Sequence, residues 1–269
     1  MKLIDTHAHL NFNAYREDSL SVLQRSLDND VWMINVGSQY STSKRAVDMA
    51  EKYQQGAYAA VGLHPIHLGS GLVQTKGDPE EIQFQTHGEV FDYEKYKKLA
   101  ESPKVVAIGE IGLDYKSEYA SFEEKQKAVL LQQIALAKEL VLPVIFHCRM
   151  AHNDLIKILN ERIADGHSGV IHCFTGSWKQ AQSYLDMGFY LGFNGIIFKL
   201  NLEEIIKKAP LEKILIETDC PYLTPPQESG RNEPIFVKHV AQKIADIKKI
   251  NIEDIIKTTT QNAKTLFRI

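Results

Sequence analysis

The sequence predicts an α/β protein with a (β/α)₈ TIM barrel that takes up the whole chain, residues 1–269, as one domain. Three observations indicate this fold. Apolar runs of strand length recur along the chain, amphipathic helical stretches separate them, and 269 residues suit one large α/β barrel. Near-continuous apolar runs are expected of parallel strands that are buried on both faces. An open, doubly wound sheet is the alternative that the same alternation allows.

Eight apolar runs are expected to form the barrel strands. They are residues 2–6, 32–36, 58–63, 105–109, 144–146, 169–171, 189–193 and 213–217. Because strands and helices alternate strictly, the sheet should be parallel.

The stretches between these runs carry apolar residues at helical spacing. We expect helices over residues 17–27, 42–53, 121–140, 153–163, 177–187, 202–208, 236–247 and 252–267. Ser121 and Ser177 each begin a capping-box pattern, which predicts the start of a helix. Gly188 and Pro210 are expected to end the helices that precede them.

One segment interrupts this alternation, at about residues 66–93 between the third strand and its helix. Asp78-Pro79 is a plausible helix start, since proline is favoured at the first helical position. We expect an insertion at the C-terminal ends of the strands, with room for a short helix. A loop of this length is either functional or a tolerated surface elaboration, and the second is slightly favoured.

The composition narrows the function class. The net charge is −3, so no broad basic field indicates bulk nucleic-acid binding. The N-terminus lacks the pattern of a signal peptide, and no apolar run approaches the ~18 residues of a membrane span. We therefore expect a cytoplasmic protein that does not bind membranes. Three cysteines do not form a disulfide framework.

Histidine and carboxylate residues follow several of the predicted strands at the point where each strand ends. Six of the eight strand ends contribute them: His7 and His9, His64, Glu110, His147, His172 and Asp219. Active sites of such barrels lie where the strands end, so these side chains should converge on one rim. His7 and His9 are two residues apart and should point to the same face of an extended strand.

Imidazoles and carboxylates together suit divalent metal ions such as Zn²⁺, Mn²⁺ or Mg²⁺. The six candidate ligands are His7, His9, Glu110, His147, His172 and Asp219. Six ligands are too many for one tetrahedral ion with an open position. We therefore expect two divalent metal ions, with Glu110 as the bridging carboxylate.

Other residues near the rim have weaker claims. Cys148, Cys173 and Cys220 each follow a proposed ligand, so they should point toward the helices as small buried residues. Arg149 and Arg231 can each bind an anion or form a structural ion pair. Two further sets are expected to have no catalytic role: the loop or cap residues Asp114, Thr175 and Asn194, and the surface residues His87, His152, His167 and His239.

The motifs at these strand ends resemble those of the TatD family of metal-dependent hydrolases, within the amidohydrolase-like superfamily. The resemblance covers the chain from Asp5 to the last helix except the insertion. It rests on Asp5-Thr6-His7-Ala8-His9-Leu10, Gly62-Leu63-His64-Pro65, Gly109-Glu110-Ile111-Gly112-Leu113-Asp114-Tyr115, His147-Cys148-Arg149, His172-Cys173-Phe174-Thr175-Gly176, Glu217-Thr218-Asp219-Cys220-Pro221-Tyr222-Leu223 and Arg231-Asn232-Glu233-Pro234.

The resemblance implies a metal-dependent deoxyribonuclease, often a 3′ to 5′ exonuclease, with single-stranded DNA or DNA 3′ ends as substrate. It also implies the role of each site residue. One ion is held by His7, His9, Glu110 and Asp219, the second by Glu110, His147 and His172, and the scissile phosphate contacts His64 and Arg149. The insertion departs from the family pattern and bears on the choice of substrate.

We therefore expect phosphodiester hydrolysis by water that two metal ions activate, with Asp219 and Glu110 as catalytic residues. One alternative keeps the metals and changes the bond, as in a D-aminoacyl-tRNA deacylase, a lactonase or an amidohydrolase. A phosphate or nucleotide in the pocket, instead of a small organic acid, would separate these two. A third hypothesis, which is the least favoured, is a metal-binding interaction module without catalysis.

Overall fold

The computed structural model describes residues 2–69, 71–74, 83–86, 88–116, 122–162 and 168–269. Eight strands pair in parallel in the order β1-β2-β3-β6-β7-β8-β9-β10. Their bounds are β1 Leu3–Ala8, β2 Val31–Val36, β3 Ala57–Val61, β6 Val105–Asp114, β7 Val144–Arg149, β8 Gly169–Ile171, β9 Tyr190–Phe193 and β10 Ile214–Ile216.

The two edges of this sheet meet, so the sheet forms a nearly closed barrel. Ala8 at the end of β1 forms a parallel bridge with Cys220, and the amide of His9 donates to the carbonyl of Cys220 at 2.9 Å. The amide of Asp219 donates to the carbonyl of His7 at 2.8 Å. The predicted (β/α)₈ barrel is confirmed. Its closing contacts lie among the predicted ligands, so barrel closure also positions the site.

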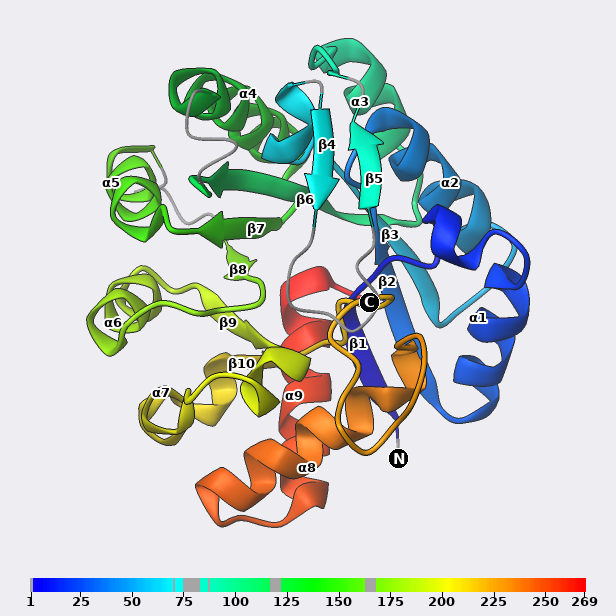
Figure 1. The fold of residues 1–269 in the computed structure, drawn as a ribbon, viewed down its shortest axis with the longest axis vertical. Coiled ribbons are helices and arrows are strands. Elements are labelled where there is room, and N and C mark those ends of the chain that lie inside the picture. Colours follow the sequence, from blue (N-terminus) through cyan, green and yellow to red (C-terminus); the bar gives the residue numbers. More distant parts are fainter. Residues whose placement is uncertain (1, 70, 75–82, 87, 117–121, 163–167) are drawn as a thin grey trace.

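Helices surround the strands in the view of Figure 1. They are α1 Ser19–Asp28, α2 Tyr40–Ala50, α3 Tyr93–Ala100, α4 Glu123–Leu140, α5 His152–Arg162, α6 Trp178–Asp186, α7 Glu203–Lys208, α8 Val237–Lys248 and α9 Ile252–Phe267. No helix within the described ranges has the length and apolar character that a bilayer crossing requires.

The helix ends follow the sequence signals where these can be compared. Ser177 and Gln180 form the predicted capping box at the start of α6. Gly188 follows α6 with φ of 90°, a conformation that glycine adopts without strain. The capping box predicted at Ser121 and the predicted helix end at Ile163 involve residues outside the described ones. In the described part, α4 begins at Glu123.

The apolar core fills the barrel interior, and the polar residues lie at one end of the barrel. Inside the barrel, buried apolar residues of the strands pack against Ala263, Leu266 and Phe267 of α9. A second, larger cluster lies between the strands and the surrounding helices. Because α9 packs against the end where the strands begin, the rim where they finish carries the polar residues.

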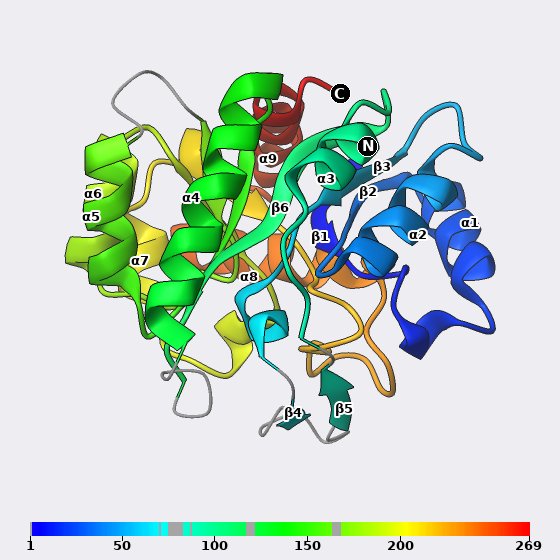
Figure 2. The ribbon, with the colours of Figure 1, turned by 90° about the horizontal axis from the view of Figure 1, so that it is seen from above.

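The insertion contains a short 3₁₀ helix, Pro65–Leu68, and an antiparallel hairpin that the sequence analysis did not predict. Its strands are β4 Gly71–Gln74 and β5 Gln83–Thr86. Figures 1 and 2 together place the hairpin beyond the rim where the barrel strands finish. The short helix predicted at Asp78 falls on residues 75–82, outside the described residues.

Candidate metal centre

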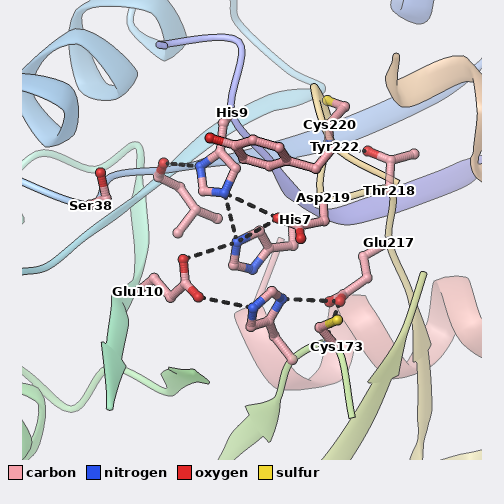
Figure 3. Close-up of polar contacts among 12 residues, drawn as sticks. His7, His9, Ser38, Glu110, Cys173, Glu217, Thr218, Asp219, Cys220 and Tyr222 are labelled. Atoms are coloured by element: carbon pink, nitrogen blue, oxygen red, sulfur yellow. Dashed lines mark hydrogen bonds and ion pairs between the residues drawn. The ribbon is translucent and has the colours of Figure 1, made fainter. Parts of the chain in front are cut away.

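Three of the predicted ligands form one side of a compact cluster at this rim. Nε2 of His7 lies 3.1 Å from Nε2 of His9, so the two imidazoles of β1 do meet at one point. Oδ1 of Asp219 lies 3.3 Å from Nε2 of His9 and 3.8 Å from Nε2 of His7. Figure 3 shows these three side chains pointing toward one another. All three ligand atoms face the same small space.

Glu110 lies at the centre of the cluster, and its two oxygens face different groups. Oε2 lies 3.5 Å from Nε2 of His7. Oε1 lies 2.9 Å from Nε2 of His172 and 3.0 Å from Nδ1 of His147. One carboxylate therefore contacts His7 of β1 through one oxygen, and His147 of β7 and His172 after β8 through the other, which is the arrangement that a bridging ligand needs.

In three of the histidines, the ring nitrogen that points away from the cluster has a hydrogen-bond acceptor. Nδ1 of His9 lies 2.8 Å from the carbonyl oxygen of Val36, and Nδ1 of His172 lies 3.1 Å from Oε1 of Glu217. Nε2 of His147 lies 2.9 Å from Oδ2 of Asp114. His147 and His172 also have Glu110 at their inner nitrogens, and against the effect of burial these carboxylates raise the pKa of both rings. In the neutral form that a metal ligand requires, each ring can donate outward and leave its inner nitrogen to an ion. Metal-ligating histidines are held in this way.

His64 shows the opposite arrangement. Its Nδ1 accepts a hydrogen bond from the amide of Ile66 at 3.1 Å, so the proton of the neutral ring is on Nε2. Nε2 lies 3.5 Å from Oε1 of Glu110. Burial lowers the pKa of His64 to about 4, which keeps the ring neutral at pH 7. His64, Glu110 and His147 lie close enough to hold an ion, but the proton on Nε2 makes His64 a donor and not a ligand.

The electrostatics of the cluster favour a bound cation. Burial by itself would raise the pKa of Glu110, but the imidazoles of His64, His172 and His7 outweigh it and hold that pKa well below its usual range. The pKa of Asp219 is lowered in the same way, with His9, His172 and His7 outweighing burial. Both carboxylates are therefore charged at neutral pH. A divalent cation that replaced the protons of these imidazoles would be well matched to the site in charge and ligand type.

Asp114 is a site residue that the sequence analysis assigned to a loop or cap. It is the last residue of β6 and is fully buried. Its carboxylate contacts Nε2 of His147 and pairs with Arg149, whose Nη2 lies 2.7 Å from Oδ2. Asp114 therefore orients one predicted ligand and one predicted phosphate-binding residue. A signal was available, because residues 110, 112 and 114 of one strand share a face.

Glu217 and Asn194 also belong to the centre. Oε1 of Glu217 accepts from Nδ1 of His172, from the amide of Cys173 at 2.8 Å and from Nδ2 of Asn194 at 3.1 Å. Asn194 is a cap, as expected, because its Oδ1 accepts from the amide of Ile196. Its amide group also holds Glu217 in place. Glu217 itself carried no sequence signal that separated it from an ordinary strand end.

The cysteines divide into two kinds. Cys148 and Cys220 are buried, as expected. Cys173 departs from the expectation, since it is partly exposed and its Sγ lies 3.5 Å from Oδ1 of Asn194, within the site (Figure 3). Its backbone has φ of 44°, so the strand alternation that predicted an outward direction no longer applies there. Burial raises the pKa of each thiol to about 12, so none offers a thiolate at neutral pH.

The remaining candidates are Arg231 and the four histidines that were expected on the surface. Arg231 stacks on the ring of Tyr15 at 4.0 Å and pairs with Asp18 at 2.6 Å, which is a structural role. His152 was expected on the surface, and this is wrong: its side chain is buried and its Nδ1 lies 3.1 Å from the hydroxyl of Tyr184. His239 is partly buried beside Glu228. His87 and His167 lie outside the described residues.

Known proteins resemble this chain in both sequence and fold. The sequence model of the family described as "TatD related DNase" matches residues 4–268. The "uncharacterized metal-dependent hydrolase YabD" of Bacillus subtilis is 43% identical, with 99% of each chain covered. The "3′-5′ ssDNA/RNA exonuclease TatD" of Shigella flexneri is 32% identical, again with 99% of each chain covered. Among solved structures, the TatD homolog YJJV from Escherichia coli has a TM-score of 0.85 at 31% identity, covering 99% of this chain and 98% of its own.

Proposed function

Because this chain belongs to the TatD-related DNase family, whose members are metal-dependent hydrolases, we propose that it removes nucleotides from the 3′ ends of single-stranded DNA. The observation that carries the proposal is Glu110, whose Oε2 faces His7 and whose Oε1 faces His147 and His172. Such a set suits the paired divalent ions that serve phosphodiester hydrolysis. The names of relatives such as the Shigella exonuclease support DNA as substrate and the 3′ to 5′ direction.

The residues divide into two ligand sets. His7, His9, Glu110 and Asp219 would hold one divalent ion, and Glu110, His147 and His172 would hold the second. Imidazole and carboxylate donors suit Zn²⁺ or Mn²⁺, and the carboxylates also admit Mg²⁺. When bound, such ions supply Lewis acidity toward water and the phosphate.

Asp219 is the proton acceptor in this proposal. Its side chain is 16% exposed, against 6% for Glu110, so water reaches Asp219 more readily. Its pKa is lowered by the surrounding imidazoles, despite burial, so the carboxylate is ionised and ready to orient the water that attacks phosphorus. Hydrolysis forms a new bond from water to phosphorus and breaks the bond from phosphorus to the 3′ oxygen. The terminal nucleotide leaves as a 5′-monophosphate.

Two residues bind the phosphate. His64 presents the proton on its Nε2, because Nδ1 accepts from the amide of Ile66. Arg149 is held by Asp114 through Nε and Nη2, with contacts of 3.0 and 2.7 Å. Guanidinium and N–H donors that are fixed before the substrate arrives stabilise the charge that grows on the phosphoryl oxygens.

The test is release of the labelled terminal nucleotide from a 3′-labelled single-stranded oligonucleotide with Mg²⁺, Mn²⁺ or Zn²⁺. We expect release that requires metal, that a chelator abolishes and that Asp219→Asn lowers about 10²–10⁴-fold in kcat. Glu110→Gln should lose bound metal as well as activity. The surface variant Glu204→Gln, whose carboxylate pairs with Lys208, is the matched control and should behave as wild type. No metal-dependent release by wild type, or equal release by the site variants, would refute the proposal.

A further inference from the structure

A cavity of about 500 Å³ opens beside the candidate metal centre. Its walls come from three neighbouring rim segments: Tyr115 after β6, residues 149–154 at the end of β7 and beyond, and residues 175–177 with Gln180 after β8. Cavities of this volume are typical of small-molecule sites. This rim is also where barrels of this kind bind their substrates.

Arg149 joins the cavity to the metal centre. Asp114 contacts His147 of the centre and pairs with Arg149, which lines the cavity. Nε and Nη2 of Arg149 are used by Asp114, and Nη1 has no hydrogen-bond partner within the described part of the chain. The Arg149 side chain is 40% exposed and so can contact a bound molecule. A phosphate bound there would lie between the metal centre and the cavity.

The cavity wall combines apolar and neutral polar groups. Tyr115, Met150 and Ala151 supply apolar surface, and Met150 is 75% exposed. Asn153 and Gln180 supply amide groups that hydrogen-bond to each other at 3.0 Å. The acidic residue of the wall, Asp154, is neutralised by Lys127 at 2.8 Å. The wall therefore suits an uncharged, partly aromatic ligand with polar edges.

His152 is a buried polar residue of the cavity wall. It lines the cavity and is only 7% exposed. Its Nδ1 contacts the hydroxyl of Tyr184, whereas Nε2 is buried without a hydrogen-bond partner among the described residues.

On the basis of the proposed nuclease function, we infer that this cavity binds the nucleoside of the 3′-terminal nucleotide, with Arg149 at its phosphate. A nucleoside has the chemistry of the wall, since its base presents apolar faces and polar edges while carrying no charge. The volume holds one nucleotide and not a longer strand, which suits removal of nucleotides one at a time.

Binding by the protein as purified tests this inference without measuring catalysis. In isothermal titration, 5′-thymidine monophosphate should bind at least about tenfold more tightly than inorganic phosphate, because the buried nucleoside adds contacts of about 1.4 kcal/mol or more. Metal content, measured by elemental analysis, supplies a readout of the centre that does not use the cavity.

Thr175→Trp is designed to fill the cavity. Thr175 lines it and is exposed, so the larger side chain does not disturb the core. We expect Thr175→Trp to weaken 5′-thymidine monophosphate binding about tenfold, to leave phosphate binding unchanged, and to leave the metal content equal to that of wild type. Thr265→Trp, at an exposed position of α9 near the opposite end of the barrel, is the matched control and should change none of these.

Three outcomes would overturn the inference. They are equal affinity for 5′-thymidine monophosphate and phosphate, unchanged nucleotide binding in Thr175→Trp, and preferential binding of an aminoacyl compound that Thr175→Trp blocks. The proposed function fails separately, if wild type releases no nucleotide from oligonucleotides with any divalent metal. Nucleotide binding that depends on residue 175 would still support the cavity in that case.

Discussion

Asp114→Asn is the substitution that most directly tests how the centre is held together. The carboxylate of Asp114 is fully buried and contacts Nε2 of His147 at 2.9 Å and Nε and Nη2 of Arg149 at 3.0 and 2.7 Å. Each of these partners is a donor. An asparagine offers one oxygen and one amino group, so the amino group must face a donor and at least one hydrogen bond is lost.

The expected cost follows from these contacts. A hydrogen bond to a charged group contributes about 1.5–3 kcal/mol. His147 is largely buried, and loss of its bond should cost about 2 kcal/mol. Arg149 is 40% exposed, so water replaces much of its pairing and the loss there is about 1 kcal/mol. A total of about 3 kcal/mol lowers the melting temperature of a chain of this size by roughly 6 °C.

The effect should depend on pH in a defined direction. Burial opposes ionisation of Asp114, but His147 and Arg149 outweigh it and lower the pKa of the carboxyl below its usual range. A lowered folded-state pKa gives stability that is fully present above the unfolded value, about 4, and is lost as the pH falls through the folded value. The difference in melting temperature between wild type and Asp114→Asn should therefore be full at pH 6 and shrink progressively below pH 4.

Thermal unfolding of chelator-treated protein, followed by circular dichroism from pH 3 to pH 7, measures this directly. Asp48→Asn is the control, since Asp48 pairs with Lys44 at 2.6 Å but is 50% exposed. Exposed pairs of this kind contribute less than about 1 kcal/mol. A melting temperature for Asp114→Asn within 1 °C of wild type at pH 6, or a loss that is equally large at pH 3, would show that the contacts do not stabilise the fold as reasoned.

Two further predictions concern the ligand sets. His7→Ala should lose one of two metal ions and leave the other partly occupied, because the second set depends on His147 and His172; full double occupancy by elemental analysis would contradict this assignment. Glu217→Gln should weaken metal binding about 10–100-fold through His172, whose Nδ1 contacts Glu217, and metal titration of the chelator-treated protein with a fluorescent competitor measures it. Metal affinity equal to wild type in Glu217→Gln would limit Glu217 to a structural role.

The fold was predictable because it depends on local patterns. Buried parallel strands are apolar along their whole length, and this length of apolar run recurs eight times, so strand count and order could be predicted before the structure was known. The hairpin β4–β5 was not predicted. Its strands have four residues each, and the alternation of polar and apolar residues in Gln83-Phe84-Gln85 was a signal for β5 that the prediction missed.

The predicted ligands converge at the rim because their position needs only residue type and the end of a strand. To predict the residues that orient those ligands, the register between strands must also be known. In the pairing of β6 with β7, Gly112 lies opposite His147 and Asp114 lies opposite Arg149. That register brings Asp114 within reach of both side chains. The spacing within β6 places Asp114 on the same face as Glu110, but it does not give this register with β7, since 33 residues separate Asp114 from His147.

The contact of Glu217 with His172 is still harder to predict from the sequence, because the two residues do not follow neighbouring strands. His172 follows β8 and Glu217 follows β10, with β9 between them in the sheet. The contact is possible because β9 carries Gly192 at this point, where a Cβ atom would lie 2.7 Å from Oε2 of Glu217. A side chain at position 192 would push the carboxylate away from Nδ1 of His172. The orientation of this predicted ligand thus depends on an absent side chain, a requirement that a residue-by-residue search for ligands does not detect.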